Sequence, residues 1–334
     1  MCRCLYPQLL GLILTGSGAD QLALQWHSAP MTVGDGWAWL DGAVQPLSQA
    51  RVPVTDRGFL LADSVFDTVR TYAGQPFLLG DHLDRLRSSA ETLWIDVPWS
   101  DQELETVVDA LLQRAGDSTA WLLRLVVSRG DGGHGLALPE PQAPRLVVLC
   151  RPVPDLPGHL YSAGVGVGRA RRKTVEGRSV PAHIKSGAYL AHVLALREAQ
   201  AAGAYEALLP GPDQSWSEAT TSNLFLVAGG ALHTPGVQHD ILPGVTRALV
   251  IAVAGEAGIP VVERPLFDSD LNAAHEVFLT SSVKEVLPVV SIDSVPVGAG
   301  VPGPITQQLR RLFREATEQL TQSGTRRLVE RYGG

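Results

Sequence analysis

Cysteine is scarce in this sequence of 334 residues, and the apolar run nearest the N-terminus, 9–14, is too short to span a membrane. Only three cysteines occur, Cys2, Cys4 and Cys150, and the first two are too close together for a disulfide of normal geometry. A disulfide framework is therefore excluded. The composition fits a reducing compartment, and we expect a cytoplasmic protein without a membrane partner.

Positive charge is also in short supply, because 27 lysines and arginines face 34 aspartates and glutamates, for a net charge of −7. This balance gives no basic surface for nucleic acid, so a small anionic metabolite would need local positive charge instead. The nine histidines are scattered without zinc-type spacing, so we expect no metal site. With 45% hydrophobic and 18% charged residues, the composition is ordinary for a soluble enzyme.

Methionine occurs only at Met1 and Met31, and this bears on where the protein starts. The apolar run 9–14 follows a single Arg3, which makes a weak match to a signal peptide. We expect residues 1–35 to be an extra N-terminal segment that is disordered or arises from a mis-assigned start, with Met31 as the true first residue. Intact-mass analysis of native protein tests this, and a mass that includes residues 2–30 would contradict it.

The rest of the chain divides at a proline-rich segment. Two short strands around the Asp41-Gly42 turn open a small first domain, 36–150, whose last predicted strand is 145–150. Prolines mark a linker over 151–160. A larger second domain, 161–334, begins with a predicted strand and closes with an amphipathic helix over 305–320.

Two helices and a glycine-rich turn are predicted within the first domain. One helix begins with Asp81 as its N-cap, and its His82, Asp84 and Arg85 are expected on the solvated or dimer-facing side. The other spans 101–115. After a strand at 121–127, the glycine-rich turn 128–135 lacks the dinucleotide-binding spacing, and no helix follows it, so a nucleotide site is excluded.

Lys185 is the main candidate for a catalytic residue, because it is the one charged residue in the run 184–190. A lysine with few charges around it can lose its proton near neutral pH and attack a carbonyl to form a Schiff base. The alternative is a surface lysine at a turn, since most lysines are solvated. A polar cluster at 217–225 follows, with Glu218 as its one acid.

Three segments in combination resemble the class IV aminotransferase family: 184–186, 217–225 and 241–247. These are the fold-type IV pyridoxal-phosphate enzymes, which include branched-chain and D-amino-acid aminotransferases, (R)-selective amine transaminases and aminodeoxychorismate lyase. The resemblance runs from about Gly36 to the end of the chain. It implies an α/β (α+β) fold with a small N-terminal α/β domain and a larger C-terminal pseudo-barrel domain. Pyridoxal 5′-phosphate would lie in the cleft between them, and the family forms homodimers.

The resemblance assigns roles in cofactor binding. Lys185 would form the Schiff base, and Glu218 would face the pyridine nitrogen of the cofactor. Arg70 lies on a predicted core-facing strand position, which is costly unless the guanidinium meets an anion. In the family, the arginine at this place binds the cofactor phosphate, although a structural salt bridge is the alternative.

Two further phosphate contacts are expected. The helix that follows the turn 242–247 offers unpaired N–H groups at its N-terminus, so the backbone of Val245 and Thr246 is the candidate there. Ser282 lies in a hydroxyl-rich turn where many relatives carry threonine.

On the substrate side, Arg124 aligns with an arginine of branched-chain enzymes and is the candidate for a substrate carboxylate. Tyr189 follows Lys185 by one position fewer than the usual tyrosine of those enzymes, so its contact is open. Leu122 stands where they carry a tyrosine, so the substrate pocket departs from theirs.

Two reaction classes stay open. The segment 185–190 favours amino-group transfer between an amino acid, most simply a branched-chain one, and a 2-oxo acid, and we prefer this reaction. The turn 128–135 favours aminodeoxychorismate lyase, which releases 4-aminobenzoate and pyruvate. A D-amino-acid transaminase is a further alternative. A binding protein without activity is the non-enzymatic alternative, and Lys185 and Glu218 together argue against it.

Overall fold

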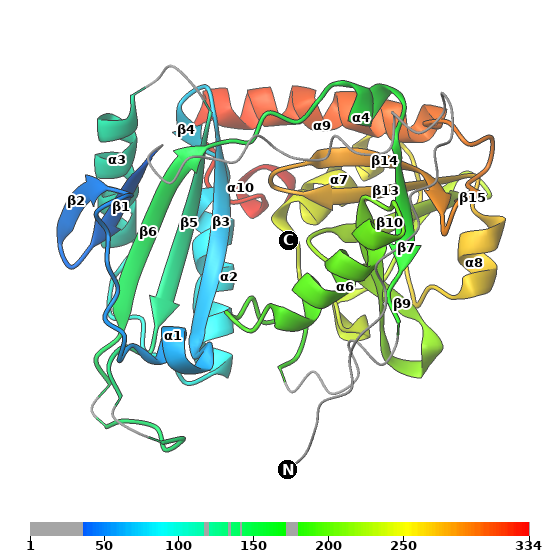
Figure 1. Cartoon of the computed structure of the whole chain (residues 1–334). Coiled ribbons are helices and arrows are strands. Elements are labelled where there is room, and N and C mark those ends of the chain that lie inside the picture. Colours follow the sequence, from blue (N-terminus) through cyan, green and yellow to red (C-terminus); the bar gives the residue numbers. More distant parts are fainter. Residues whose placement is uncertain (1–35, 117–119, 133–134, 141, 172–179, 334) are drawn as a thin grey trace, which may run out of the picture. The chain divides into compact units, whose positions relative to one another are not determined.

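Alternating apolar side chains in the first part of the chain form a six-stranded sheet (Figure 1). The structure is a computed structural model that describes residues 36–116, 120–132, 135–140, 142–171 and 180–333. The N-terminal segment predicted over 1–35 lies outside them. The strand order is β2-β1-β6-β5-β3-β4. The strands are β1 (Trp37–Leu40), β2 (Ala43–Pro46), β3 (Ser64–Tyr72), β4 (Gln75–Pro76), β5 (Trp121–Ser128) and β6 (Arg145–Pro152).

The hairpin between β1 and β2 confirms the predicted turn. Asp41 and Gly42 have φ angles of 52° and 85°, the left-handed values that a two-residue turn requires at both of its central positions. Glycine and aspartate tolerate this region better than most residues do, so the local sequence determines the turn.

Two helices, α2 (Leu79–Thr92) and α3 (Asp101–Ala115), cover one face of this sheet. Their leucines pack with Val65 and Val69 of β3 in one buried cluster. Helix α3 begins with a capping box between Ser100 and Glu103. The predicted cap of α2 is wrong, because α2 begins earlier, after Leu78 in a left-handed conformation, and Asp81 accepts from the Leu328 N–H instead.

The second sheet contains a closed barrel, as the family resemblance predicted. Strand β9 (Trp216–Ala219) pairs with both β8 (Glu206–Pro210) and β10 (Asn223–Ala228). The ring is completed by β13 (Glu276–Ser281), β14 (Glu285–Ile292) and β7 (Val165–Arg169). Strands β11 (Ala231–Thr234), β12 (Val261–Glu263) and β15 (Val295–Pro296) extend the sheet beyond the ring.

Helices α7 (Val245–Glu256) and α9 (Pro304–Ser323) pack against the outside of this barrel. Their apolar sides share a cluster with Phe225 and Phe278, whose rings stack at 4.9 Å. The other described helices are α1 (Arg57–Leu61), α4 (His159–Ser162), α6 (Leu190–Ala201), α8 (Asp268–Ala273) and α10 (Val329–Tyr332), with 3-10 turns at Pro212–Gln214 and Val237–His239.

The segment around Lys185 is attached to the edge of β3, although it belongs in sequence to the second half of the chain. The Phe66 N–H donates to the Lys185 carbonyl at 2.8 Å, and the Lys185 N–H donates to Ser89 Oγ at 3.1 Å. A Cβ on Gly187 would lie 2.4 Å from Ser64 Oγ, so this close approach requires glycine. The lysine is therefore held by backbone bonds at the junction of the two sheets.

The predicted linker, 151–160, contains the end of β6 and the start of α4. The domain boundaries themselves stay a prediction. Within the part of the chain that the structure describes, no helix is long and apolar enough to cross a bilayer.

Candidate active site

Lys185 lies in a partly buried position between two aromatic rings. Its Nζ is 3.4 Å from the Tyr189 hydroxyl and 4.9 Å from the centre of the Phe66 ring. Burial, and next the positive charge of Arg85, lower the pKa of Lys185 to about 8, while the charges of Asp67 and Glu218 oppose this shift. A useful fraction of this amine is therefore neutral near physiological pH, as a nucleophile requires.

The scarcity of lysine adds weight to this residue. The sequence contains three lysines, and Lys173 lies outside the described residues. Lys284 forms an ion pair with the buried Glu206 at 2.6 Å and donates to Thr221 Oγ1 and Ser222 Oγ. Because these three contacts occupy the amine of Lys284, Lys185 is the described lysine suited to act as a nucleophile.

Glu218 of β9 is buried, and two N–H groups fix its orientation. Its Oε2 accepts from Asn223 Nδ2 at 3.3 Å and from the Leu242 N–H at 3.0 Å. Asn223 lies opposite Glu218 in the β9–β10 pair and also donates to the Leu242 carbonyl. The negative charge of Glu218 opposes the lowering of the Lys185 pKa and helps to raise the Tyr189 pKa, so Glu218 lies within electrostatic range of both.

Arg70 reaches from β3 to the turn between β13 and β14. Its Nη1 donates to the Val283 carbonyl at 3.1 Å and lies 3.3 Å from Glu285 Oε1. Its Nε is buried without a hydrogen-bond partner. The structure thus brings Arg70 next to Ser282, which lies in the same turn, and leaves one guanidinium N–H for an anion.

Val245 and Thr246 are the first two residues of α7, so the helix starts inside the turn predicted over 242–247. The N-cap is Gly244, and no side chain caps this end, so the first N–H groups are not satisfied by a capping residue. Leu242, just before the helix, is the residue that Glu218 binds. The backbone of Val245 and Thr246, which the sequence predicted as a phosphate contact, therefore lies close to Glu218, the acid predicted to face the pyridine nitrogen.

Asp67 was not identified from the sequence as part of this junction, and His82 and Arg85 were placed on the wrong side of their helix. His82 and Arg85 are not on a solvated face. His82 is 2% exposed with its Nδ1 2.7 Å from Asp67 Oδ1, and Arg85 binds the same carboxylate through Nε and Nη2, each at 2.8 Å. Burial opposes the ionisation of Asp67, but Arg85 and His82 hold its pKa below the ordinary value. Arg85 also donates to the Pro243 carbonyl at 3.0 Å, which ties α2 to the start of α7.

One signal could have found this group. Asp67 lies two residues from both Val65 and Val69 on β3, so the three side chains share one face, and the Asp67 carboxylate points to the buried side of the sheet. A buried carboxylate needs a cation or several donors, and the helix that covers this face offers His82 and Arg85.

Arg124 and Tyr189 gather around the Phe66 ring. The Arg124 guanidinium lies 3.6 Å above the ring centre, and the Tyr189 ring packs edge-on at 5.2 Å. Burial, and next the charge of Glu218, raise the pKa of Tyr189, so its hydroxyl stays protonated. Both residues therefore lie beside Lys185, with Phe66 as their common support.

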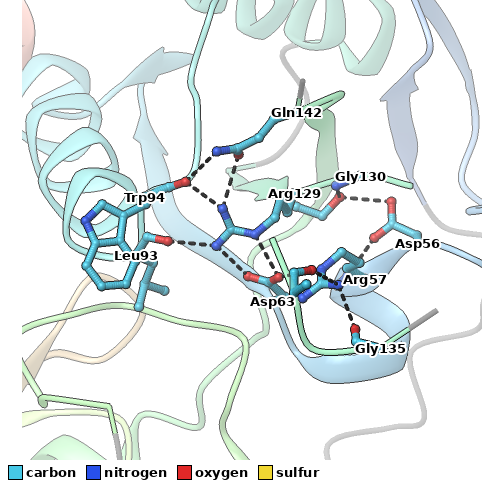
Figure 2. A network of polar contacts seen from close by, with 12 residues as sticks. Asp56, Arg57, Asp63, Leu93, Trp94, Arg129, Gly130, Gly135 and Gln142 are labelled. Atoms are coloured by element: carbon cyan, nitrogen blue, oxygen red, sulfur yellow. Dashed lines mark hydrogen bonds and ion pairs between the residues drawn. The ribbon is translucent and has the colours of Figure 1, made fainter. Parts of the chain in front are cut away.

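The glycine-rich turn 128–135 is anchored by a polar network (Figure 2). Arg57 and Arg129 share the Asp63 carboxylate, with both Nε atoms 2.8 Å from Oδ2. Arg57 also donates to the Gly135 carbonyl at 3.0 Å, and Arg129 to the carbonyls that follow α2, those of Leu93 and Trp94. The described part of this turn is thus fixed to α1 and α2 by charge-assisted bonds.

Comparison with known proteins agrees with this geometry. The model of the family "Amino-transferase class IV" matches residues 64–292. A protein of Methanocaldococcus jannaschii, "Putative branched-chain-amino-acid aminotransferase", is 37% identical over 282 residues, which cover 83% of this chain and 95% of that protein. A "D-alanine aminotransferase" of Listeria innocua is 35% identical over 277 residues, or 80% of this chain and 91% of its own.

Solved structures of a similar fold include a T.th. branched-chain amino acid aminotransferase in two complexes. The structure with pyridoxamine 5′-phosphate has a TM-score of 0.79 at 29% identity and covers 89% of this chain and 96% of its own. The complex with N-(5′-phosphopyridoxyl)-L-glutamate has a TM-score of 0.78 at 30% identity and covers 88% and 96%. By its sequence and by the site that its two sheets build, the chain belongs to the class IV aminotransferase family, and it is a pyridoxal-phosphate-dependent transaminase.

Proposed function

We propose that this transaminase moves the amino group of a branched-chain amino acid to a 2-oxo acid, which yields the branched-chain 2-oxo acid and a new amino acid. The observation that carries the proposal is the cluster of Lys185, Tyr189 and Glu218 at the junction of the two sheets. The branched-chain type is supported by the names of the Methanocaldococcus jannaschii relative and of the T.th. enzyme. Glutamate as the second amino acid is supported by the adduct in the T.th. structure.

The residues present fit pyridoxal phosphate. Arg70 keeps a buried Nε without a partner, and α7 begins without a side-chain cap, so both offer N–H groups to a phosphate. Together with Ser282 and the backbone of Val245 and Thr246, they would hold it. Glu218 would face the pyridine nitrogen, and Lys185 would bind the aldehyde carbon.

When bound, the cofactor supplies an electron sink for the carbanion formed at the substrate α-carbon. Lys185 Nζ would take the proton from the substrate α-carbon and give it to the cofactor carbon that receives the amino group. A pKa of about 8 suits this task, since a proton carrier works best near the operating pH. Glu218, whose orientation is fixed by its two N–H donors, would keep a proton on the pyridine nitrogen. Tyr189 orients the amine through its protonated hydroxyl, and Arg124 binds a substrate carboxylate.

A D-amino-acid transaminase is the second candidate, because the Listeria innocua relative is named a D-alanine aminotransferase at 35% identity. The third is the lyase, for which the turn 128–135 is the sequence feature. The described part of this turn is the segment that Arg57 and Arg129 hold in Figure 2.

The test is a set of half-reactions. The purified holoenzyme is mixed separately with L-leucine, L-glutamate, D-alanine and an (R)-amine, and the change in cofactor absorbance is followed. Conversion by L-leucine supports the proposal, and conversion by D-alanine alone assigns the second candidate. If no amine changes the spectrum while aminodeoxychorismate yields 4-aminobenzoate, the protein is the lyase.

We also propose a cytoplasmic homodimer. Exposed apolar side chains on α1 and α6 support a contact between copies, since Phe59 and Leu190 are 72% and 70% exposed. The segments that flank the two helices lie against each other, because Gly187, before α6, approaches Ala62 and Ser64, which follow α1. Light scattering during size exclusion tests the dimer, and a monomer mass would contradict it.

A further inference from the structure

Arg151 shares the face of the six-stranded sheet on which Arg124 lies. Antiparallel pairing places Arg151 of β6 opposite Leu122 of β5, and Arg124 opposite Leu149. Directly paired residues point to the same side, and Leu122 and Arg124 are two apart, so both arginines project from one face. They occupy diagonal positions, which side chains of this length can bridge.

Neither arginine has a carboxylate partner among the described residues. Arg145, on the same strand as Arg151, pairs with Asp56, whereas Arg151 has its Nε buried without any hydrogen bond. A buried guanidinium N–H without an acceptor is costly, because the lost hydration is not replaced. The pair thus offers two positive charges that the described chain does not neutralise.

The pair lies on the substrate side of the site. Arg124 and Lys185 Nζ both contact the Phe66 ring, at 3.6 Å and 4.9 Å from its centre. Burial lowers the pKa of Arg124, the Tyr189 hydroxyl opposes this, and the charge of Arg151 lowers it further. Two like charges are therefore near enough to repel each other, and a carboxylate between them would stabilise both.

We propose that Arg151 is a specificity residue that, together with Arg124, binds the second carboxylate of a dicarboxylic amino acid or 2-oxo acid of glutamate size. The inference rests on the proposed transamination and names the residue that separates acidic from branched-chain substrates. A monocarboxylic substrate has no second carboxylate to place between the two guanidinium groups and leaves their charges unmatched. A dicarboxylic substrate brings a second carboxylate that both arginines can bind.

The test compares Arg151→Ala and Arg151→Lys with the wild type in half-reactions. The donors are glutamate and leucine, or D-glutamate and D-alanine if the wild type accepts only that configuration. For Arg151→Ala, we expect the KM for glutamate to rise about tenfold or more, while the KM for the monocarboxylic donor stays within about twofold. Arg151→Lys should show a KM for glutamate between those of Arg151→Ala and the wild type, since lysine keeps the positive charge but lacks the two parallel N–H donors of the guanidinium group. Arg311→Ala, which removes a charge from an arginine of α9 that is 67% exposed, is the control and should change neither KM.

An equal effect of Arg151→Ala on both donors would overturn the inference, as would a wild type that converts leucine but not glutamate. A wild type that converts no amine at all would instead contradict the proposed transamination. If Arg151→Ala changes the oligomeric mass and leaves both KM values as they were, the arginine belongs to a subunit contact and the inference is wrong.

Discussion

The lowered pKa of Lys185 predicts how the apoenzyme captures its cofactor. Only the neutral amine attacks an aldehyde, so the capture rate should rise with pH, reach half its maximum near pH 8 and level off at higher pH. At pH 7 a lysine with a pKa of about 8 is neutral in about 10% of molecules, against about 0.03% at the ordinary value of 10.5, which is a rate advantage of about 300-fold. Burial is the largest cause of the shift, and Arg85 is the next.

The assay is stopped-flow absorbance after mixing apoenzyme with pyridoxal phosphate between pH 6 and pH 10. Arg85→Gln removes a positive charge that lowers the Lys185 pKa. It also leaves Asp67, whose negative charge raises the Lys185 pKa, without its ion-pair partner Arg85. The midpoint should therefore move to higher pH in this variant, while Arg311→Gln, the exposed control, should leave it near pH 8. A wild-type midpoint at pH 10 or above, or equal midpoints in Arg85→Gln and the wild type, would refute the reasoning.

Three further predictions follow from single contacts. Asp67→Asn should lower the free energy of unfolding of the apoenzyme by about 3 to 5 kcal/mol in urea denaturation, because it leaves the buried Arg85 without its carboxylate; a loss below about 1 kcal/mol would count against it. Glu218→Gln should keep the cofactor absorbance but reduce kcat by about 10²-fold or more, and unchanged turnover would remove Glu218 from the mechanism. Cys150, whose pKa burial raises to about 12, should resist alkylation in the native protein and react after denaturation, as peptide mass spectrometry can show.

Local patterns in the sequence were sufficient for much of the fold. The Asp41-Gly42 hairpin, the helix predicted over 101–115 and the alternation that puts Arg70 on one face of β3 depend on neighbouring residues, and the structure shows each of them. The barrel was predicted from the family resemblance. Hydrophobic periodicity could not predict it, because the closure of the barrel depends on the pairing of β9 with β10.

The site is harder to predict, because its supports come from distant segments. The Lys185 segment pairs with the edge of β3, a contact that no local pattern encodes. Arg85 was expected on the solvated or dimer-facing side because helical periodicity gives the apolar face of α2 but does not show the Asp67 carboxylate buried beneath it. Its burial follows from Asp67 on the facing strand, so only the tertiary packing of α2 on β3 reveals it. The roles of Glu218, Ser282, Val245 and Thr246 in cofactor binding stay predictions.

The central claim is that Lys185 carries the cofactor, and three lysines in the chain make the test sharp. The holoenzyme is reduced with borohydride, digested and analysed by mass spectrometry. We predict a phosphopyridoxyl group on the peptide with Lys185, and loss of both cofactor absorbance and activity in Lys185→Ala. A label on Lys173 or Lys284 instead, or turnover retained in Lys185→Ala, would contradict the account.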